Sequence, residues 1–151
     1  MLTALSAVRL RELIGTGEIS PVELLDACID RIQRLNPAVN AVTATCFARA
    51  RREATAAEAA VRNGEPLGPL HGLPLGVKDL ENTAGLLTTR GSPLLRDNVP
   101  DADGAAVARL RAAGAIVIGK TNVPEWGAGA NSRNPVWGAT GNAFDPMRNA
   151  G

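Results

Sequence analysis

DADGAAVARLRAAGAIVIGK, residues 101–120, is the stretch of sequence that decides the fold class. Its first part mixes small apolar and charged residues in a pattern typical of a helix, and Gly114 suits the C′ position at which a helix ends. Asp101 or Asp103 is the expected cap at the start of this helix. The run GAIVIG, residues 114–119, is typical of a buried strand. The stretch therefore predicts a helix that leads directly into a core strand.

A second strand is predicted upstream, at LPLGVK, residues 73–78. Strand, helix and strand in this order form a right-handed crossover, so the two strands are expected to be parallel and covered by helices. We predict an α/β fold with part of a mixed, mainly parallel sheet. Ligands of such sheets bind beyond the carboxyl ends of the strands. Lys78 and Lys120 end the two strands, and we expect both to face the functional edge.

The rest of the chain divides in two by composition. Residues 1–64 predict a helical N-terminal region, and residues 65–151, rich in Gly and Pro, predict the first part of the α/β core. Helices are expected at 3–14 and 47–62, the second ended by an Asn-Gly pair. The β-branched run NAVTATC, residues 40–46, is a weak strand candidate.

The longest predicted helix has clear end signals. Ser20 is the expected N-cap, with Pro21 at the first helical position and Glu23 completing a capping box. Asn36 and Pro37 are expected to stop this helix, because the residue before a proline avoids the α region.

Composition limits the possible partners. The 151 residues fit one domain, and 45% hydrophobic with 21% charged residues is ordinary for a soluble globular protein. The formal net charge of +1 argues against a nucleic-acid-binding surface. The densest basic run, Arg49, Arg51 and Arg52, is interpreted as a solvated helix face with Glu53 four residues after Arg49.

The sequence also predicts a soluble, cytoplasmic protein. Arg9 and Arg11 interrupt the N-terminus before an apolar signal segment can form. No apolar run approaches the roughly 18–20 residues that a membrane span needs. Cys28 and Cys46 are then expected to be reduced thiols.

Residues 114–121, GAIVIGKT, satisfy the phosphate-loop pattern G-x-x-x-x-G-K-[ST]. A functional phosphate loop lies between a strand and a helix and wraps phosphates with its backbone. Here the four intervening residues are themselves the predicted strand. We therefore interpret the match as accidental and keep a nucleotide-binding module only as the weakest alternative.

Lys78 is the candidate for chemistry. Gly72 and Gly76 have no side chains, so another part of the chain or a ligand can approach the backbone of this strand closely. Leu75 and Val77 suggest apolar surroundings, which would lower the pKa of the amine and allow it to take a proton from a serine hydroxyl. The alternative, a lysine that extends into solvent and pairs with an acidic neighbour, stays open on these residues alone.

Four segments in order resemble the amino-terminal part of the amidase signature family. They are GPLHGLPLGVKD (68–79), TTRGS (88–92), DADGAAVARLRAAGAIVIGKTNVPEW (101–126) and GNAFDP (141–146). The resemblance implies the amidase-signature fold and hydrolysis of small-molecule carboxylic amides through an acyl-serine intermediate, without metal or organic cofactor. It implies a Ser–cis-Ser–Lys triad in which Lys78, in the Gly-Val-Lys-Asp segment, is the proton-transfer residue.

The resemblance also implies where the serines lie. In the family a segment like 142–146 leads into a Gly/Ser-rich run that holds the bridging serine, and the nucleophilic serine follows later. Both are expected beyond residue 151, so the chain is expected to be an N-terminal fragment that is inactive alone. The partners considered are the missing carboxy-terminal portion or a homodimer mate. None of Ser6, Ser20, Ser92 and Ser132 is assigned as nucleophile.

Two alternative functions remain from the same residues. One is the amidase subunit of a tRNA-dependent amidotransferase, which releases ammonia from glutamine for a partner subunit. The other is a non-enzymatic, truncated remnant that needs a complementing chain.

Other conspicuous side chains are predicted to be structural. His71, the single histidine, lacks an Asp or Ser partner pattern around it. Trp126 and Trp137 are expected to be packing anchors. Lys120 and Glu125 are expected to form an ion pair beneath the site.

Overall fold

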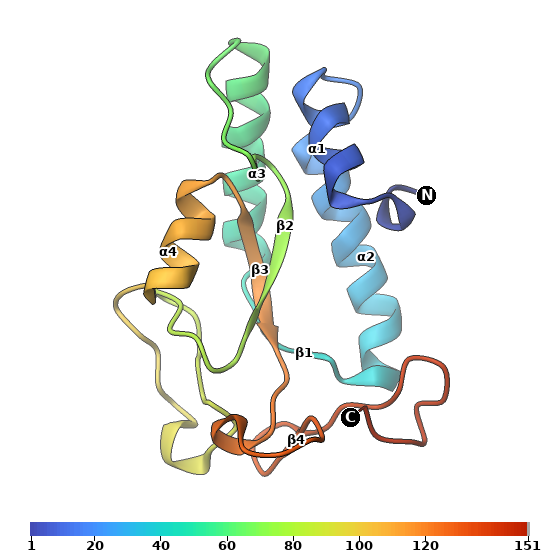
Figure 1. The fold of residues 1–151 in the computed structure, drawn as a ribbon, viewed down its shortest axis with the longest axis vertical. Helices are drawn as coiled ribbons and strands as arrows, with labels where there is room; N and C mark the ends of the chain where they lie inside the picture. Colours follow the sequence, from blue (N-terminus) through green and yellow to red (C-terminus); the bar gives the residue numbers. More distant parts are fainter. Residues whose placement is uncertain (151) are drawn as a thin grey trace.

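A mixed three-stranded sheet forms the centre of the computed structural model, which describes residues 1–150. The strand order is β1 (Val42–Thr45), β3 (Ile116–Thr121), β2 (Pro74–Lys78). β2 runs parallel to β3, and β1 pairs with β3 in the antiparallel direction. The predicted α/β class is confirmed (Figure 1).

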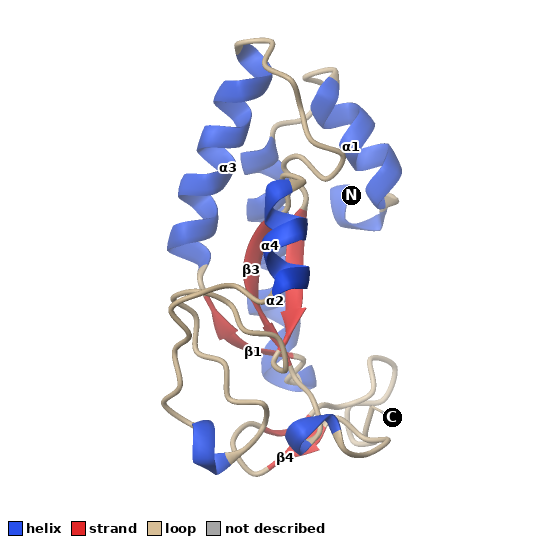
Figure 2. Cartoon of the chain, turned by 60° about the vertical axis from the view of Figure 1, so that its left-hand side comes forward, coloured by secondary structure: helices blue, strands red, loops and turns tan. Residues whose placement is uncertain are grey.

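Helices cover both faces of this sheet. α2 (Pro21–Val39) and α3 (Phe47–Arg62) lie on one face, and α4 (Ala105–Ala112) lies on the other, as Figure 2 shows. α1 (Ala7–Gly15) packs beside the first half of α2. β2, α4 and β3 are the predicted strand–helix–strand unit, so the stretch at 101–120 does contain a helix followed by a core strand.

Small side chains make the core possible in a chain with few aromatic residues. Ala50 and Ala54, one helical turn apart on α3, are fully buried and pack against Ile116 and Ile118 of β3. The short alanine side chains let the helix approach the sheet closely. A second cluster on the α4 face contains Val77, Leu86, Val107 and Val117. A third joins α1 to α2 through Leu10, Ile14, Leu24 and Leu73.

The start of α2 is as predicted. The Ser20 hydroxyl accepts hydrogen bonds from the amides of Val22 (3.0 Å) and Glu23 (3.1 Å). The Glu23 carboxylate in turn accepts from the Ser20 amide at 2.8 Å. The capping box is therefore complete.

The end of α2 differs from the prediction. The helix continues through Pro37 and is capped by Asn40, whose φ is 53°. A proline removes one helical hydrogen bond, but the Asn36 side chain closes the end of the helix in another way. Its Oδ1 accepts from the amides of Ala41 (2.9 Å) and Val42 (2.8 Å), and its Nδ2 donates to the Val42 carbonyl (2.7 Å). The prediction that Asn36 and Pro37 stop the helix was wrong.

Two other helix starts also differ. The segment predicted as one helix from residue 3 is a short 3-10 turn, Leu2–Ala4, followed by α1, because the Ser6 hydroxyl caps α1 by accepting from the Arg9 amide. α4 has Gly104 as its N-cap residue, without a side-chain cap. The expected cap Asp103 instead accepts a hydrogen bond from the Ala84 amide.

The remaining elements lie mostly between and after the strands. α3 spans the predicted residues, and Gly64 follows it with φ 68°. Short 3-10 turns occur at Pro93–Leu95 and Glu125–Gly127, and a small hairpin joins β4 (Arg133–Asn134) to β5 (Gly138–Ala139).

Two further features concern the helices and the cysteines. Within residues 1–150, no helix combines the length and the apolar character needed to cross a membrane. Cys28 and Cys46 are free thiols.

Candidate active site

Lys78 lies at the carboxyl end of β2, where the register pairs it with Thr121 of β3. The amide of the next residue, Asp79, donates to the Thr121 carbonyl at 3.0 Å, so the two backbones remain paired just past the strand. The Lys78 side chain is exposed, and its amine has no hydrogen bond or ion pair within residues 1–150. The prediction of apolar surroundings for Lys78 was wrong. The Val77 side chain, only 5% exposed, points to the buried face of the sheet, and the Lys78 side chain points to the opposite face.

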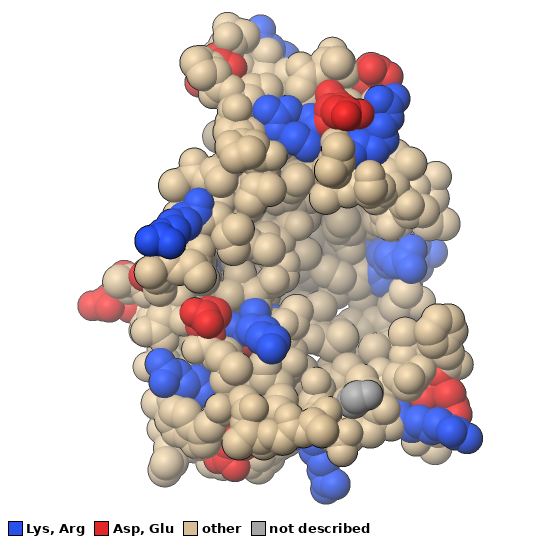
Figure 3. All heavy atoms as spheres, in the orientation of Figure 1, with Lys and Arg blue, Asp and Glu red and all other residues tan. Residues whose placement is uncertain are grey.

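An apolar groove opens on the molecular face seen in Figure 3, where few charged side chains line the hollow. Its volume is about 530 Å³, and it lies between α2, the N-terminal 3-10 turn and the sheet. Leu73 and Pro74 at the start of β2 line it, but Lys78 at the other end of the strand does not.

Asp79 is the buried anchor beside Lys78. Its carboxylate accepts from the Thr89 amide (2.9 Å), the Thr89 hydroxyl (2.6 Å) and the Trp137 indole N–H (3.1 Å). Its backbone carbonyl accepts from the Arg90 amide at 2.9 Å. Among the described residues 1–150, Asp79 forms no ion pair with Lys78. Trp137, expected to be a packing anchor, is also a hydrogen-bond donor to the site.

The end of β3 is tied to the small hairpin by amide side chains. Asn134 Nδ2 donates to Asn122 Oδ1 at 2.7 Å, and Asn122 Nδ2 donates to the Thr140 hydroxyl at 3.0 Å. Asn134 Oδ1 accepts from the Trp137 amide at 2.8 Å. The hairpin thus holds Trp137 in place for its bond to Asp79.

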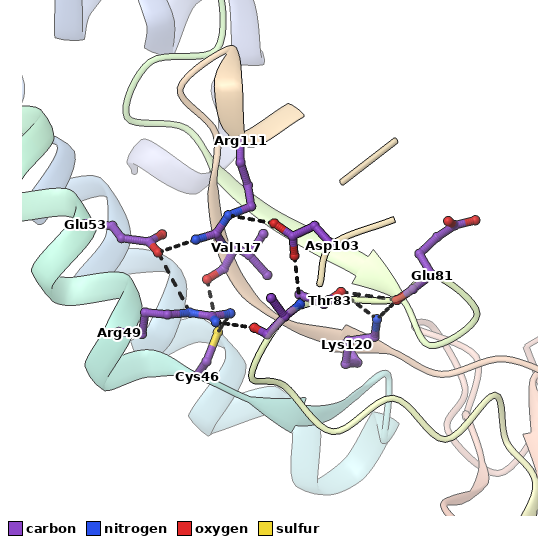
Figure 4. Close-up of polar contacts among 10 residues, drawn as sticks. Cys46, Arg49, Glu53, Glu81, Thr83, Asp103, Arg111, Val117 and Lys120 are labelled. Carbon is purple, nitrogen blue, oxygen red and sulfur yellow. Dashed lines mark hydrogen bonds and ion pairs between the residues drawn. The ribbon is translucent and has the colours of Figure 1, made fainter. Parts of the chain in front are cut away.

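Lys120 is the lysine that is buried. Its side chain is 0% exposed, and its ammonium donates to the Glu81 carbonyl and to the Thr83 hydroxyl, the latter at 2.9 Å (Figure 4). No ion pair joins it to Glu125 within residues 1–150, so that expectation was wrong. The sequence signal was present, because this lysine directly follows the buried run Ile-Val-Ile-Gly.

Burial changes the acidity of Lys120. Desolvation lowers the pKa of its ammonium from 10.5 to about 8. The effect would be larger without the opposing charges of Asp79, Glu81, Asp103 and Cys46, in this order of strength. A buried lysine with two hydrogen-bond acceptors and nearby carboxylates fits a structural anchor.

A set of ion pairs lies next to Lys120 in Figure 4. Arg49 was expected on a solvated face, but its guanidinium donates to the Ala84 carbonyl at 2.6 Å and lies 3.8 Å from Glu53. Arg111 bridges Glu53 (2.8 Å) and Asp103 (3.3 Å). The other oxygen of Asp103 accepts from the Ala84 amide at 2.8 Å, which explains why it does not cap α4.

Trp126 departs from the expected role of a packing anchor. It is 48% exposed, and the Arg90 guanidinium lies 5.6 Å from its ring centroid. Both residues have positive φ, 55° and 52°, and the Trp126 amide donates to the Arg90 carbonyl at 2.8 Å. Non-glycine residues in this region are uncommon and concentrate at functional sites.

The other candidate groups have local structural roles. His71 Nε2 lies 2.9 Å from the Ala57 carbonyl oxygen. Ser6 and Ser20 cap helices, Ser92 is buried in the turn before Pro93–Leu95, and the backbone of Ser132 bonds to Thr140. Between residues 1 and 150, no group of three or more His, Cys, Asp and Glu side chains could hold a metal ion.

The phosphate-loop pattern is incompatible with its surroundings. Its last six residues, Ile116 to Thr121, form β3, and the strand leads into a turn at Glu125–Gly127 and not into an α-helix. The backbone of this segment is paired with β1 and β2 and cannot wrap a phosphate.

Known proteins resemble this chain in sequence and in fold. A sequence model of the Amidase family matches residues 23–151. A glutamyl-tRNA(Gln) amidotransferase subunit from Roseiflexus castenholzii is 41% identical over 145 residues, 96% of this chain and 28% of that protein. Fatty acid amide hydrolase superposes with a TM-score of 0.91 at 27% identity, over 97% of this chain and 26% of that structure. A bacterial aryl acylamidase of the amidase signature family gives a TM-score of 0.85 at 30% identity, over 93% and 30%.

The coverage shows how much of the family is present. This chain spans between about a quarter and a third of the length of these relatives. The matched part carries Lys78 at the carboxyl end of β2, with Asp79 buried beside it. The family model covers most of the chain, and the chain therefore belongs to the amidase family.

Proposed function

We propose that the complete protein hydrolyses carboxylic amides through an acyl-serine intermediate, with Lys78 as its proton-transfer residue. The observation that carries the proposal is the position of Lys78. It presents an exposed amine at the carboxyl end of a parallel strand, next to the buried Asp79, whose carboxylate accepts three hydrogen bonds. Ligands of parallel sheets bind at this edge. Membership of the amidase family supports the choice of reaction.

The proposed chemistry is the one that the resemblance to the amidase signature family implies. The nucleophilic serine attacks the amide carbon, and its proton passes through the bridging serine to the amine of Lys78. The tetrahedral intermediate collapses, the leaving amine takes the proton, and water then hydrolyses the acyl-serine. The proposal assigns both serines, in a Ser–cis-Ser–Lys triad, to the part of the protein outside these 151 residues, so that this segment alone is inactive. We further propose a cytoplasmic location, in keeping with the free thiols of Cys28 and Cys46.

The test uses the protein purified from its source. Its intact mass is compared with 15.6 kDa, and its hydrolysis of a panel of simple aliphatic and aryl amides is measured. A heavier, active protein whose Lys78→Ala variant loses at least about a thousandfold in kcat supports the proposal, since triad residues contribute on this scale. Arg52 is an exposed cation on α3, and the Arg52→Ala variant, the matched control, is expected to remain active. Full activity in Lys78→Ala would contradict the assigned role.

A second function is supported by the relative that is 41% identical, which belongs to an amidotransferase. In this alternative the protein releases ammonia from glutamine for a partner subunit. Glutaminase activity that rises when copurifying subunits are retained, with weak hydrolysis of other amides, would favour it. An intact mass of 15.6 kDa with no hydrolysis would favour a remnant that needs a complementing chain or a second copy of itself.

A further inference from the structure

The segment Glu81–Ala84 follows Lys78 and Asp79 directly and is held from several directions. The Glu81 amide donates to the Lys78 carbonyl at 3.1 Å, so the segment begins with a turn closed on Lys78 itself. The Asn82 carbonyl accepts from the Gly104 amide at 2.8 Å. Any movement of this segment would therefore move the backbone that carries the candidate catalytic lysine.

Lys120 holds one side of the segment. Its buried ammonium donates to the Glu81 carbonyl and to the Thr83 hydroxyl. Lys120 belongs to β3, the strand whose next residue, Thr121, pairs with Lys78. β3 therefore contacts the end of β2 through the pairing of Thr121 with Lys78, and it contacts the turn that follows through Lys120, whose bonds Figure 4 shows.

Arg49 and Asp103 hold the other side. The Ala84 carbonyl accepts from Arg49 at 2.6 Å, and the Ala84 amide donates to Asp103 at 2.8 Å. Arg111 and Glu53 link these two groups, so α3 and α4 support the segment together. These ion pairs attach the Ala84 end of the segment to the helices, and Lys120 attaches its Glu81 end to the sheet.

The sheet register separates the two lysines. The pairing of β2 with β3 shifts by one residue between Leu75 and Gly76, so Val77 lies opposite Lys120 and Lys78 opposite Thr121. Side chains alternate between faces along a strand, so the side chains of Lys78 and Lys120 project from opposite faces of the sheet. Lys120 is thus placed to act on Lys78 through the backbone and not by direct contact.

We propose that Lys120 is a positioning residue, whose buried ammonium fixes the Glu81–Thr83 turn and through it the backbone of Lys78. This inference rests on the proposed function, because the reaction is the one assigned to Lys78. Groups that orient a catalytic residue matter since a misplacement of about 1 Å can cost about a hundredfold in rate. The residue touches no reacting atom in this proposal.

The first test is amide hydrogen exchange in the complete protein, which does not depend on activity. Lys120→Met preserves the length and volume of the side chain but removes the donors. Exchange of the Glu81 and Ala84 amides is expected to become at least about tenfold faster, with the amides of α2 unchanged. Arg52 is an exposed cation on α3, and Arg52→Met is the matched control. It is expected to leave the exchange rates of the Glu81 and Ala84 amides and of α2 unchanged. Unchanged exchange at Glu81 and Ala84 would overturn the proposal.

The second test separates positioning from general stability. In Lys120→Met, kcat for amide hydrolysis is expected to fall about a hundredfold while KM changes by less than about twofold. Thr83→Val removes one acceptor of Lys120 at nearly constant volume, and a loss of about tenfold in kcat is expected. Thr83→Ser retains the hydroxyl and is expected to restore most of the rate.

The results also separate this inference from the proposed function. A wild-type protein that hydrolyses no amide overturns both the reaction and the role of Lys120 in it. An active wild-type protein with normal kcat in Lys120→Met and Thr83→Val overturns the positioning role alone. Should Lys120→Met fail to fold, the comparison of Thr83→Val with Thr83→Ser decides the matter.

Discussion

The indole nitrogen of Trp137 donates a hydrogen bond of 3.1 Å to the carboxylate of Asp79, although 58 residues separate them in the sequence. The same indole N–H lies 2.9 Å from the Thr89 hydroxyl, which in turn donates to Asp79. Three parts of the chain thus meet at the residue after Lys78. This cluster links the end of β2 to the hairpin that follows β3.

We expect Asp79→Asn to destabilise the protein by about 2–3 kcal/mol, because the carboxylate accepts three hydrogen bonds in a buried site. An asparagine must turn its NH₂ group toward at least one of these donors. The free energy of unfolding is measured by urea denaturation, with the exposed Asp97→Asn as control. Equal stability of the two variants would show that the cluster contributes little.

We expect Lys120 to make the free energy of unfolding increase with pH. Its folded-state pKa of about 8 lies below the ordinary 10.5, so between these values the unfolded chain binds a proton that the folded protein does not. The free energy of unfolding therefore increases as pH rises through this window, by at most about 3 kcal/mol.

Lys120→Met isolates this contribution. Burial raises the pKa of the Cys28 thiol, which acts in the opposite direction at alkaline pH, but this effect is common to both proteins and cancels in their difference. The stability of wild type relative to Lys120→Met should thus grow between pH 8 and 10.5, as followed by urea denaturation at several pH values. A constant difference across this window would contradict the lowered pKa.

The end of α2 should depend on Asn36. Its side chain makes three hydrogen bonds to the backbone of Ala41 and Val42, so Asn36→Ala is expected to cost about 2 kcal/mol of stability. Gln33→Ala, on an exposed position of the same helix, is the control and should be within about 0.5 kcal/mol of wild type. Similar denaturation midpoints for the two variants would mean that the helix end does not need this side chain.

Gly114 should tolerate no side chain. Its φ is 97°, and an added Cβ would lie 2.6 Å from the Cα of His71. Backbone strain and the clash together predict a loss of roughly 2–4 kcal/mol in Gly114→Ala. Gly17 also has positive φ, 74°, but open space around it, so Gly17→Ala should show only the strain, about 1 kcal/mol. Thermal unfolding of the pair checks this order, and equal losses would exclude the clash.

Most secondary structure was predictable because its signals are local. The capping box at Ser20, the helix over Phe47–Arg62 and the buried run before Lys120 each depend on neighbours a few residues apart. The two wrong predictions have different origins. The Asn36 side chain bonds to the backbone five and six residues later, which the Asn-Pro signal does not indicate, whereas Asp103 bonds to Ala84, 19 residues away, which the fold brings near it.

The site was predictable only in part. Lys78 could be selected from its strand and from the family resemblance, and its catalytic role stays a prediction. The partners of Asp79 and Lys120 come from segments 10 to 58 residues away, which no local pattern specifies.

The sequence by itself determined the α/β class, the family and the place of Lys78 at a strand end, since these follow from local hydrophobic patterns and short motifs. Only the tertiary structure decided which lysine is buried. In an unbroken register from Pro74, Lys78 would lie opposite Lys120 on the same face. The pairing instead skips Ile118 of β3, so Lys120 lies opposite the buried Val77 and not opposite Lys78. Lys78, next to Val77 on β2, faces solvent, and Lys120 is buried beneath the turn that follows Lys78.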